Sequence, residues 1–82
     1  MIYWEKHDHD NNRHSWYHVS LCRDLFGDLI LSKKWGIIGR RGYRERMQPL
    51  HTPDELRRHL QSVGRQRAAH GYAIKKVGGG PA

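Results

Sequence analysis

The stretch from Lys33 to Gly42 constrains the fold most, because a strand pattern there runs directly into a basic turn. Glycines stand at every third position, Gly36, Gly39 and Gly42, and they let the backbone reverse and let another chain or ligand come close. Two lysines precede the turn, two arginines lie within it, and Trp35 stands at its start. Positive charge around an indole ring is typical of a site that holds phosphate while the ring stacks on a sugar or base.

Length and cysteine content narrow the class of protein. The chain has 82 residues, which is enough for one small domain. Its single cysteine, Cys22, excludes an internal disulfide and favours a reducing compartment. No apolar run approaches the roughly 20 residues that span a bilayer, and the first residues lack the basic start and apolar stretch of a signal peptide. We therefore expect a cytoplasmic protein without a membrane partner.

Charge is distributed unevenly along the chain, whose formal net charge is +7. Residues 1–31 hold three lysines and arginines against five acidic residues, whereas residues 32–82 hold twelve against three. Ten of the fifteen basic residues are arginines, which favour bidentate contacts with phosphate. This basic excess favours a nucleic-acid partner. The alternative is a basic surface that only keeps a small protein soluble.

The hydropathy pattern predicts a series of short strands. Residues 1–13 are rich in His, Asp and Asn and predict a poorly ordered arm, in which only the apolar residues 2–4 are suited to dock as a short edge strand. Alternation of polar and apolar residues predicts strands over residues 15–23, 29–35 and 43–48. Gly27 marks the turn between the first two, and Pro49 ends the third or places it at a sheet edge.

One helix is predicted after these strands. Thr52 supplies an N-cap hydroxyl, Pro53 occupies the first helical position, and Glu55 provides the carboxylate of a capping box. Apolar residues at 56, 60 and 63 form a stripe that faces the sheet, and the helix arginines lie mostly off it. Gly64 is a place where the helix can kink, and Gly71 is a natural end.

These elements predict an α+β fold, a small antiparallel sheet of about four strands with one capped helix packed on one face. Residues 72–77 add a last short strand, and residues 78–82 are a Gly-rich flexible tail. The expected organisation is an arm over residues 1–13, one domain over residues 14–77, and the tail.

The basic turn resembles the signature of the WGR domain, usually Trp-Gly-Arg-(Ile/Val)-Gly followed by a few residues and another Gly. Here Trp35-Gly36 is followed by Ile37, so the third letter of the motif differs. Other segments resemble the family in the right order: the aromatic strand at 15–21, the strand at 28–35, the capped helix start at 50–56, and the Gly-Tyr pair at 71–72. The resemblance covers roughly residues 14–76 and is specific because several separated matches agree.

The resemblance implies a small sheet-and-helix module that binds nucleic acid. In poly(ADP-ribose) polymerases this domain grips a DNA end, with the motif tryptophan against the terminal nucleotide and basic residues on the backbone. Bacterial chains of this kind often stand alone. The catalytic domain of the polymerases has no counterpart in this sequence, so the resemblance implies binding rather than ADP-ribosyl transfer.

The candidate nucleic-acid-binding residues all lie in or beside the turn: Trp35, Lys33, Lys34, Gly36, Gly39, Arg40, Arg41, Arg44 and Arg46. The alternative role of the tryptophan is to fill the core against Tyr17 or Leu60. The two strand arginines are expected to share a face with the second lysine, and the alternative for them is an ordinary solvated edge.

A second hypothesis for the same turn is a protein adaptor that docks on an acidic partner. Exposure of both Ile37 and Ile38 would favour the adaptor, and their burial would favour nucleic acid. DNA is a more natural partner than RNA for this family, and the oligomeric state is left open.

The remaining polar clusters do not predict catalysis or a cofactor. The histidines at 7, 9, 14 and 18, with the acids at 8 and 10, have the composition of a metal site. However, the expected arm offers no helix or strand to fix their geometry, so we expect no metal site there. Cys22, with His18 or His51 as a base, is more typical of a small apolar residue than of a nucleophile. We expect no enzyme and no cofactor.

Overall fold

The computed structural model describes residues 1–78 and consists of one five-stranded antiparallel sheet and one helix. The elements in chain order are β1 (Ile2–Asp8), β2 (Arg13–Arg23), β3 (Leu29–Ile37), β4 (Tyr43–Pro49), α1 (Pro53–Ala69) and β5 (Ala73–Val77). The fold is therefore the predicted α+β arrangement, with one strand more than expected.

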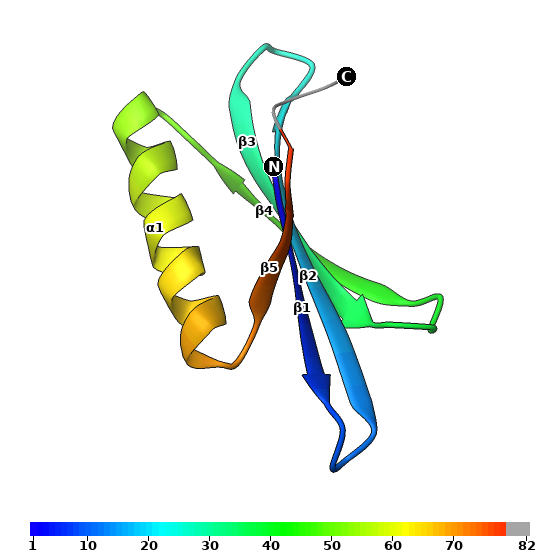
Figure 1. Ribbon diagram of the computed structural model, residues 1–82. Coiled ribbons are helices and arrows are strands. Elements are labelled where there is room, and N and C mark those ends of the chain that lie inside the picture. The colour runs from blue at the N-terminus through cyan, green and yellow to red at the C-terminus, as the bar shows by residue number, and fades with distance from the viewer. Residues whose placement is uncertain (79–82) are drawn as a thin grey trace.

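The sheet is a meander that the helix closes. Strands β1 to β4 pair with their neighbours in sequence, and the spatial order is β4-β3-β2-β1-β5. Helix α1 runs along one side of the sheet and returns the chain to the opposite edge, where β5 pairs with β1 (Figure 1). The other side of the sheet has no helix among residues 1–78.

The helix begins as its capping residues predict. Thr52 Oγ1 accepts a hydrogen bond from the Glu55 backbone N–H at 3.3 Å, and the Glu55 carboxylate accepts one from the His51 N–H at 3.1 Å. The carboxylate thus reaches one residue beyond the N-cap. The helix continues through Gly64 without a break and ends before Gly71, whose φ of +84° suits a residue without a Cβ.

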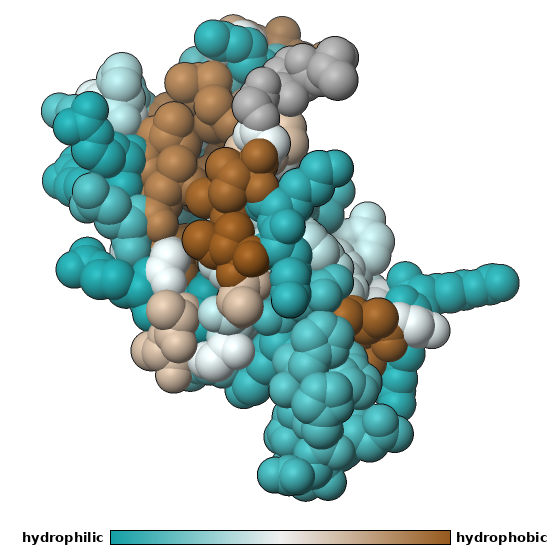
Figure 2. All heavy atoms as spheres, viewed as in Figure 1, coloured by the Kyte–Doolittle hydropathy of each residue, from teal (hydrophilic) through white to brown (hydrophobic). Residues whose placement is uncertain are grey.

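The core lies between the sheet and the helix. Its buried side chains are Trp4, Tyr17, Val19, Leu31, Leu50 and Val63. They come from β1, β2, β3, the β4–α1 connection and α1, so each of these segments contributes to one cluster. Figure 2 shows apolar side chains gathered between the helix and the neighbouring strands, with polar side chains over most of the remaining visible surface.

The first strand corrects the expectation of a poorly ordered arm over residues 1–13. Strand β1 lies inside the sheet, paired with β2 over its whole length and with β5 on its other side. Trp4 is only 2% exposed and meets Tyr17 edge-on at 5.8 Å between ring centroids. Burial of this indole stabilises the strand despite its polar neighbours, because Glu5 and His7 alternate onto the open face and Lys6 lies over the Tyr72 ring. The predicted flexible tail over residues 78–82 lies outside the described residues except for Gly78.

No helix among residues 1–78 has both the length and the apolar character needed to cross a membrane.

The position of Trp4 generates a stability prediction. Replacing Trp4 by Ala should destabilise the protein by about 3–5 kcal/mol, since the change leaves a large cavity in the core. Denaturant unfolding followed by circular dichroism measures this difference. Leu25→Ala is the matched control, because Leu25 is 100% exposed and its removal should change stability little. Equal stability of the Trp4→Ala variant and the parent protein would contradict the central role of β1.

Candidate nucleic-acid interface

The pairing of β3 with β4 decides which basic side chains share a face. Lys33 lies opposite Arg46 and Trp35 opposite Arg44, whereas Lys34 lies opposite Glu45. Directly opposed residues of antiparallel strands point to the same side of the sheet, and successive residues alternate. The strand arginines therefore share the helix side with Lys33 and Trp35. The expectation that these arginines share a face with Lys34 is wrong, because Glu45, which lies between them in β4, is the residue opposite Lys34.

Trp35 lies at the border between the core and the surface. Its ring stacks on Tyr17 with centroids 5.7 Å apart and an interplanar angle of 14°, and it packs against the buried cluster. Trp35 therefore makes the core contact with Tyr17 that was expected as its alternative to nucleic-acid binding. The tryptophan also lines two hollows in the surface, so its ring is only half-buried and remains accessible to a ligand.

The larger hollow is a cleft of about 600 Å³ on the helix side of the sheet. The side of the cleft that faces the helix includes Trp35, Tyr72 and three arginines, and its whole lining comprises Arg13, Ser15, Trp35, Gly36, Ile37, Arg40, Gly42, Tyr43, Arg44 and Tyr72. Among residues 1–78, no carboxylate lines it. A cleft of this size accommodates one small organic group, and aromatic rings with arginines provide stacking and anion-binding contacts together.

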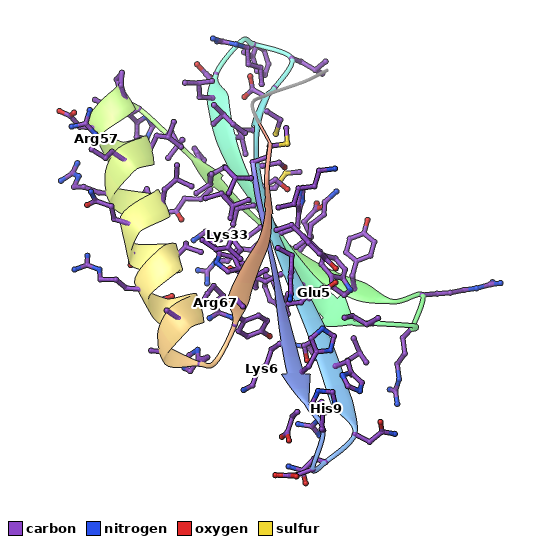
Figure 3. All side chains as sticks on the ribbon, viewed as in Figure 1. Glu5, Lys6, His9, Lys33, Arg57 and Arg67 are labelled. Atoms are coloured by element: carbon purple, nitrogen blue, oxygen red, sulfur yellow. The ribbon has the colours of Figure 1, made fainter. Side chains whose placement is uncertain are left out.

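The smaller hollow, of about 280 Å³, lies between α1 and the sheet. Its lining is Tyr17, Lys33, Trp35, Arg46, Gln66 and Arg67, again without a carboxylate. Figure 3 shows Lys33 and Arg67 in the space between the helix and the sheet. We call Lys33, Arg46 and Arg67 the cationic triad.

The cationic triad is electrostatically unfavourable in the free protein. Partial burial lowers the pKa of Lys33, and the nearby charges of Arg46 and Arg67 lower it further. The Arg67 guanidinium lies 4.4 Å from the Tyr17 ring centroid, and its Nε is buried without a hydrogen-bond partner. Three cations with an unsatisfied buried donor form a place where a bound anion would relieve repulsion and supply the missing acceptor.

Lys34 occupies a different environment from Lys33. Its Nζ lies 3.4 Å from the Glu45 carboxylate and 5.6 Å from the Tyr43 ring centroid, on the side of the sheet away from the helix. Its charge is thus balanced by a neighbour. The structure separates the two adjacent lysines that the sequence analysis placed in one site.

The turn itself depends on two glycines for different reasons. Gly39 has φ +90°, which a residue with a Cβ adopts only under strain. A Cβ on Gly36 would lie 3.1 Å from Trp16 Nε1 and 3.1 Å from the Gly42 carbonyl oxygen. Gly42 has neither a positive φ nor a close contact. Only two of the three regularly spaced glycines are therefore required by the structure, one for its backbone conformation and one for lack of space.

The arginines of the turn are exposed. Arg40 and Arg41 both face solvent, and Arg40 also lines the larger cleft. The Ile38 N–H donates to the His14 carbonyl at 2.9 Å, which ties the turn to β2. The turn therefore holds Arg40 beside the cleft.

Two arginines of this surface were missed by sequence reasoning. Arg67 continues the apolar stripe of α1, four residues after Val63, so its spacing placed it on the sheet-facing side even though its charge argued for solvent. Arg13 begins β2 beside the cleft, where the sequence analysis expected an arm. Helical spacing could have identified Arg67, and no comparable local signal marked Arg13.

Comparison with known families agrees with this geometry. The family model described as the WGR domain matches residues 1–78. The chain belongs to the WGR domain family. The match begins at the first residue, which agrees with β1 being part of the domain rather than an arm before it. No curated protein and no solved structure matched the chain significantly.

Membership in the WGR family carries a general function. The family is a nucleic-acid-binding module, and it is a binding domain rather than a catalytic one. A general DNA-binding role for this chain follows from that membership. The motif position that departs from the family, Ile37, lies at the end of β3 and lines the larger cleft.

The contact between Gly36 and Trp16 gives a prediction about the turn. Gly36→Ala should destabilise the protein by about 1–3 kcal/mol, because the new methyl group displaces either the indole or the backbone of the turn. Gly42→Ala is the matched control, since nothing lies within 4 Å of a Cβ built there. Thermal unfolding of both variants checks the difference. Equal melting temperatures would show that the Trp16 side chain moves aside at no cost.

Proposed function

We propose that this WGR domain binds DNA through the helix side of its sheet, with a backbone phosphate at the cationic triad and a base or sugar in the larger cleft. The observation that carries the proposal is the triad itself. Three cations face one hollow without a carboxylate, and the buried Arg67 Nε lacks a partner. A phosphate offers several acceptor oxygens and a charge of the required sign.

The two hollows share Trp35, which supports a continuous binding surface. A phosphate held beside the tryptophan places the attached sugar or base near the aromatic lining of the cleft. The cleft volume suits a single nucleotide unit rather than an intact duplex. This supports the finer proposal that the domain favours a DNA end or break, where a terminal nucleotide is accessible.

A protein adaptor for an acidic partner is the second candidate function. Ile37 and Ile38 are 38% and 39% exposed at the turn, and exposure of both was the expected sign of an apolar protein contact. Ile37 also lines the larger cleft, where an apolar wall equally suits the face of a base. Binding experiments separate the two functions.

The adjacent lysines provide a matched test of the proposed phosphate site. Lys33→Met should weaken DNA binding and reduce the slope of log affinity against log salt by about 0.9, the value for one phosphate contact on duplex DNA. Lys34→Met should have a clearly smaller effect, since Lys34 lies on the other face beside Glu45. Fluorescence anisotropy with a labelled duplex over a range of salt concentrations measures both. Equal losses in the two variants would remove the triad from the binding site.

The same substitution has a predicted effect on stability. The folded-state pKa of Lys33 is lowered, so the folded protein disfavours its charged form relative to the unfolded chain. The contribution of this group to stability therefore rises as pH increases through its folded-state pKa. At neutral pH, Lys33→Met should leave the melting temperature unchanged or raise it, although it weakens DNA binding. A large fall in melting temperature would mean that the lysine stabilises the fold.

Preference for DNA ends is tested with three labelled DNAs: a 5′-phosphorylated blunt duplex, the same sequence closed by hairpins at both ends, and a single strand. Anisotropy at about 50 and 200 mM salt should give tighter binding to the open duplex at both concentrations. Trp35→Leu, which keeps apolar contact with Tyr17 but removes the ring, should reduce that preference. Equal binding to open and closed duplexes would contradict end recognition. Absence of DNA binding at the lower salt would favour the adaptor.

A further inference from the structure

Three histidines meet at the turn end of the β1–β2 hairpin, away from the cationic triad. His7 of β1 and His14 of β2 are directly paired across the two strands. His9, in the turn between them, has its ring centroid 6.2 Å from that of His7 and 5.5 Å from that of His14. Figure 3 shows His9 near the tip of the hairpin. The sequence predicted no strand that would fix these histidines, whereas in the structure His7 lies in β1 and His14 in β2.

The ring nitrogens of the paired histidines face each other. His7 Nδ1 lies 2.7 Å from His14 Nδ1. Two nitrogens at this separation cannot both carry a proton, and they either share one proton in a hydrogen bond or direct both lone pairs at a common acceptor. Metal–nitrogen bonds of about 2.0–2.1 Å place neighbouring donor atoms about 2.9–3.4 Å apart. The observed separation is slightly below this range, so the two rings would need to move only a little apart to bind one ion.

A chain of hydrogen bonds determines which ring nitrogen of His7 carries the proton. The Glu5 carboxylate lies 3.0 Å from His7 Nε2, and the Tyr3 hydroxyl donates to the same carboxylate at 2.9 Å. A carboxylate that accepts from Nε2–H leaves Nδ1 as the lone-pair nitrogen, and the same carboxylate–histidine arrangement orients ligands in metal sites.

We propose that His7 and His14 bind one divalent transition-metal ion, such as Zn²⁺ or Ni²⁺, through their Nδ1 atoms, with Glu5 as the positioning residue of His7. No group of three or more His, Cys, Asp and Glu side chains within residues 1–78 is arranged to hold a metal ion. The site is thus a two-histidine site whose other coordination positions are open to water. Imidazole ligands suit ions of this class. The bound ion would join β1 to β2 at the end of the hairpin that the helix does not cover.

This proposal is independent of DNA binding, because none of its residues lines either hollow on the helix side. His7, Glu5 and Tyr3 alternate on the face of β1 opposite to that of the buried Trp4. Metal binding and DNA binding can therefore succeed or fail separately.

The test is isothermal titration of the 82-residue chain with ZnCl₂ and with NiCl₂ at about pH 7.5. The expected result is one saturable site per chain. His7→Ala and His14→Ala should each weaken binding tenfold or more, and Glu5→Gln should weaken it about tenfold by releasing the ring of His7. His51→Ala is the matched control, because His51 is exposed in the β4–α1 connection and should leave the affinity unchanged.

Nuclear magnetic resonance of the imidazole protons gives a second readout. Substoichiometric metal should shift or broaden the His7 and His14 signals before those of His51 and His70. Melting curves without metal establish that the variants are folded. Equal loss of affinity in the His51→Ala control, or simultaneous titration of all exposed histidines, would show adventitious binding and overturn the proposal. Failure to saturate at one ion per chain would also overturn it, and would leave the His7–His14 contact as a hydrogen bond.

Discussion

Tyr17 connects the parts of this domain that are otherwise separate. Its ring meets the buried Trp4 edge-on, stacks on Trp35, and lies 6.4 Å from the Tyr72 ring at a steep angle. The Arg67 guanidinium covers the same ring at 4.4 Å. Aromatic contacts of this kind add to the free energy of burial and fix ring orientation. The core on one side of Tyr17 therefore positions the tryptophan and the arginine of the candidate interface on the other.

The interface contains charges that the fold does not neutralise. Among residues 1–78, Glu45 pairs with Lys34, Glu5 contacts His7, and Glu55 caps the helix, so these carboxylates are engaged away from the cationic triad. Partial burial, followed by repulsion from Arg46 and Arg67, lowers the pKa of Lys33, which means that the free protein bears an electrostatic cost there. A bound anion would relieve this electrostatic cost. The arrangement is therefore consistent with the nucleic-acid-binding role of the WGR family.

Several parts of the fold could be predicted from local patterns, and others could not. The helix start was predictable from Thr52 and Glu55, because N-caps act through hydrogen bonds within four residues. The strand β1 was not, since its polar residues resemble a disordered segment and only the burial of Trp4 by distant residues makes the strand stable. The role of Arg67 was also obscured, because its charge argues for solvent while its spacing places it under the aromatic rings.

The sequence by itself determined the secondary structure of residues 13–77 to a large extent and the concentration of positive charge in the second part of the chain. Period-two alternation, capping residues and composition act locally and can be read without a fold. The tertiary structure decided which charges share a surface. Pairing of β3 with β4 put Arg44 and Arg46 on the face of Lys33 rather than on that of Lys34, and packing of α1 brought Arg67 to Lys33 and Arg46. Strand register and helix docking depend on contacts between distant residues, so only the folded chain brings these side chains together.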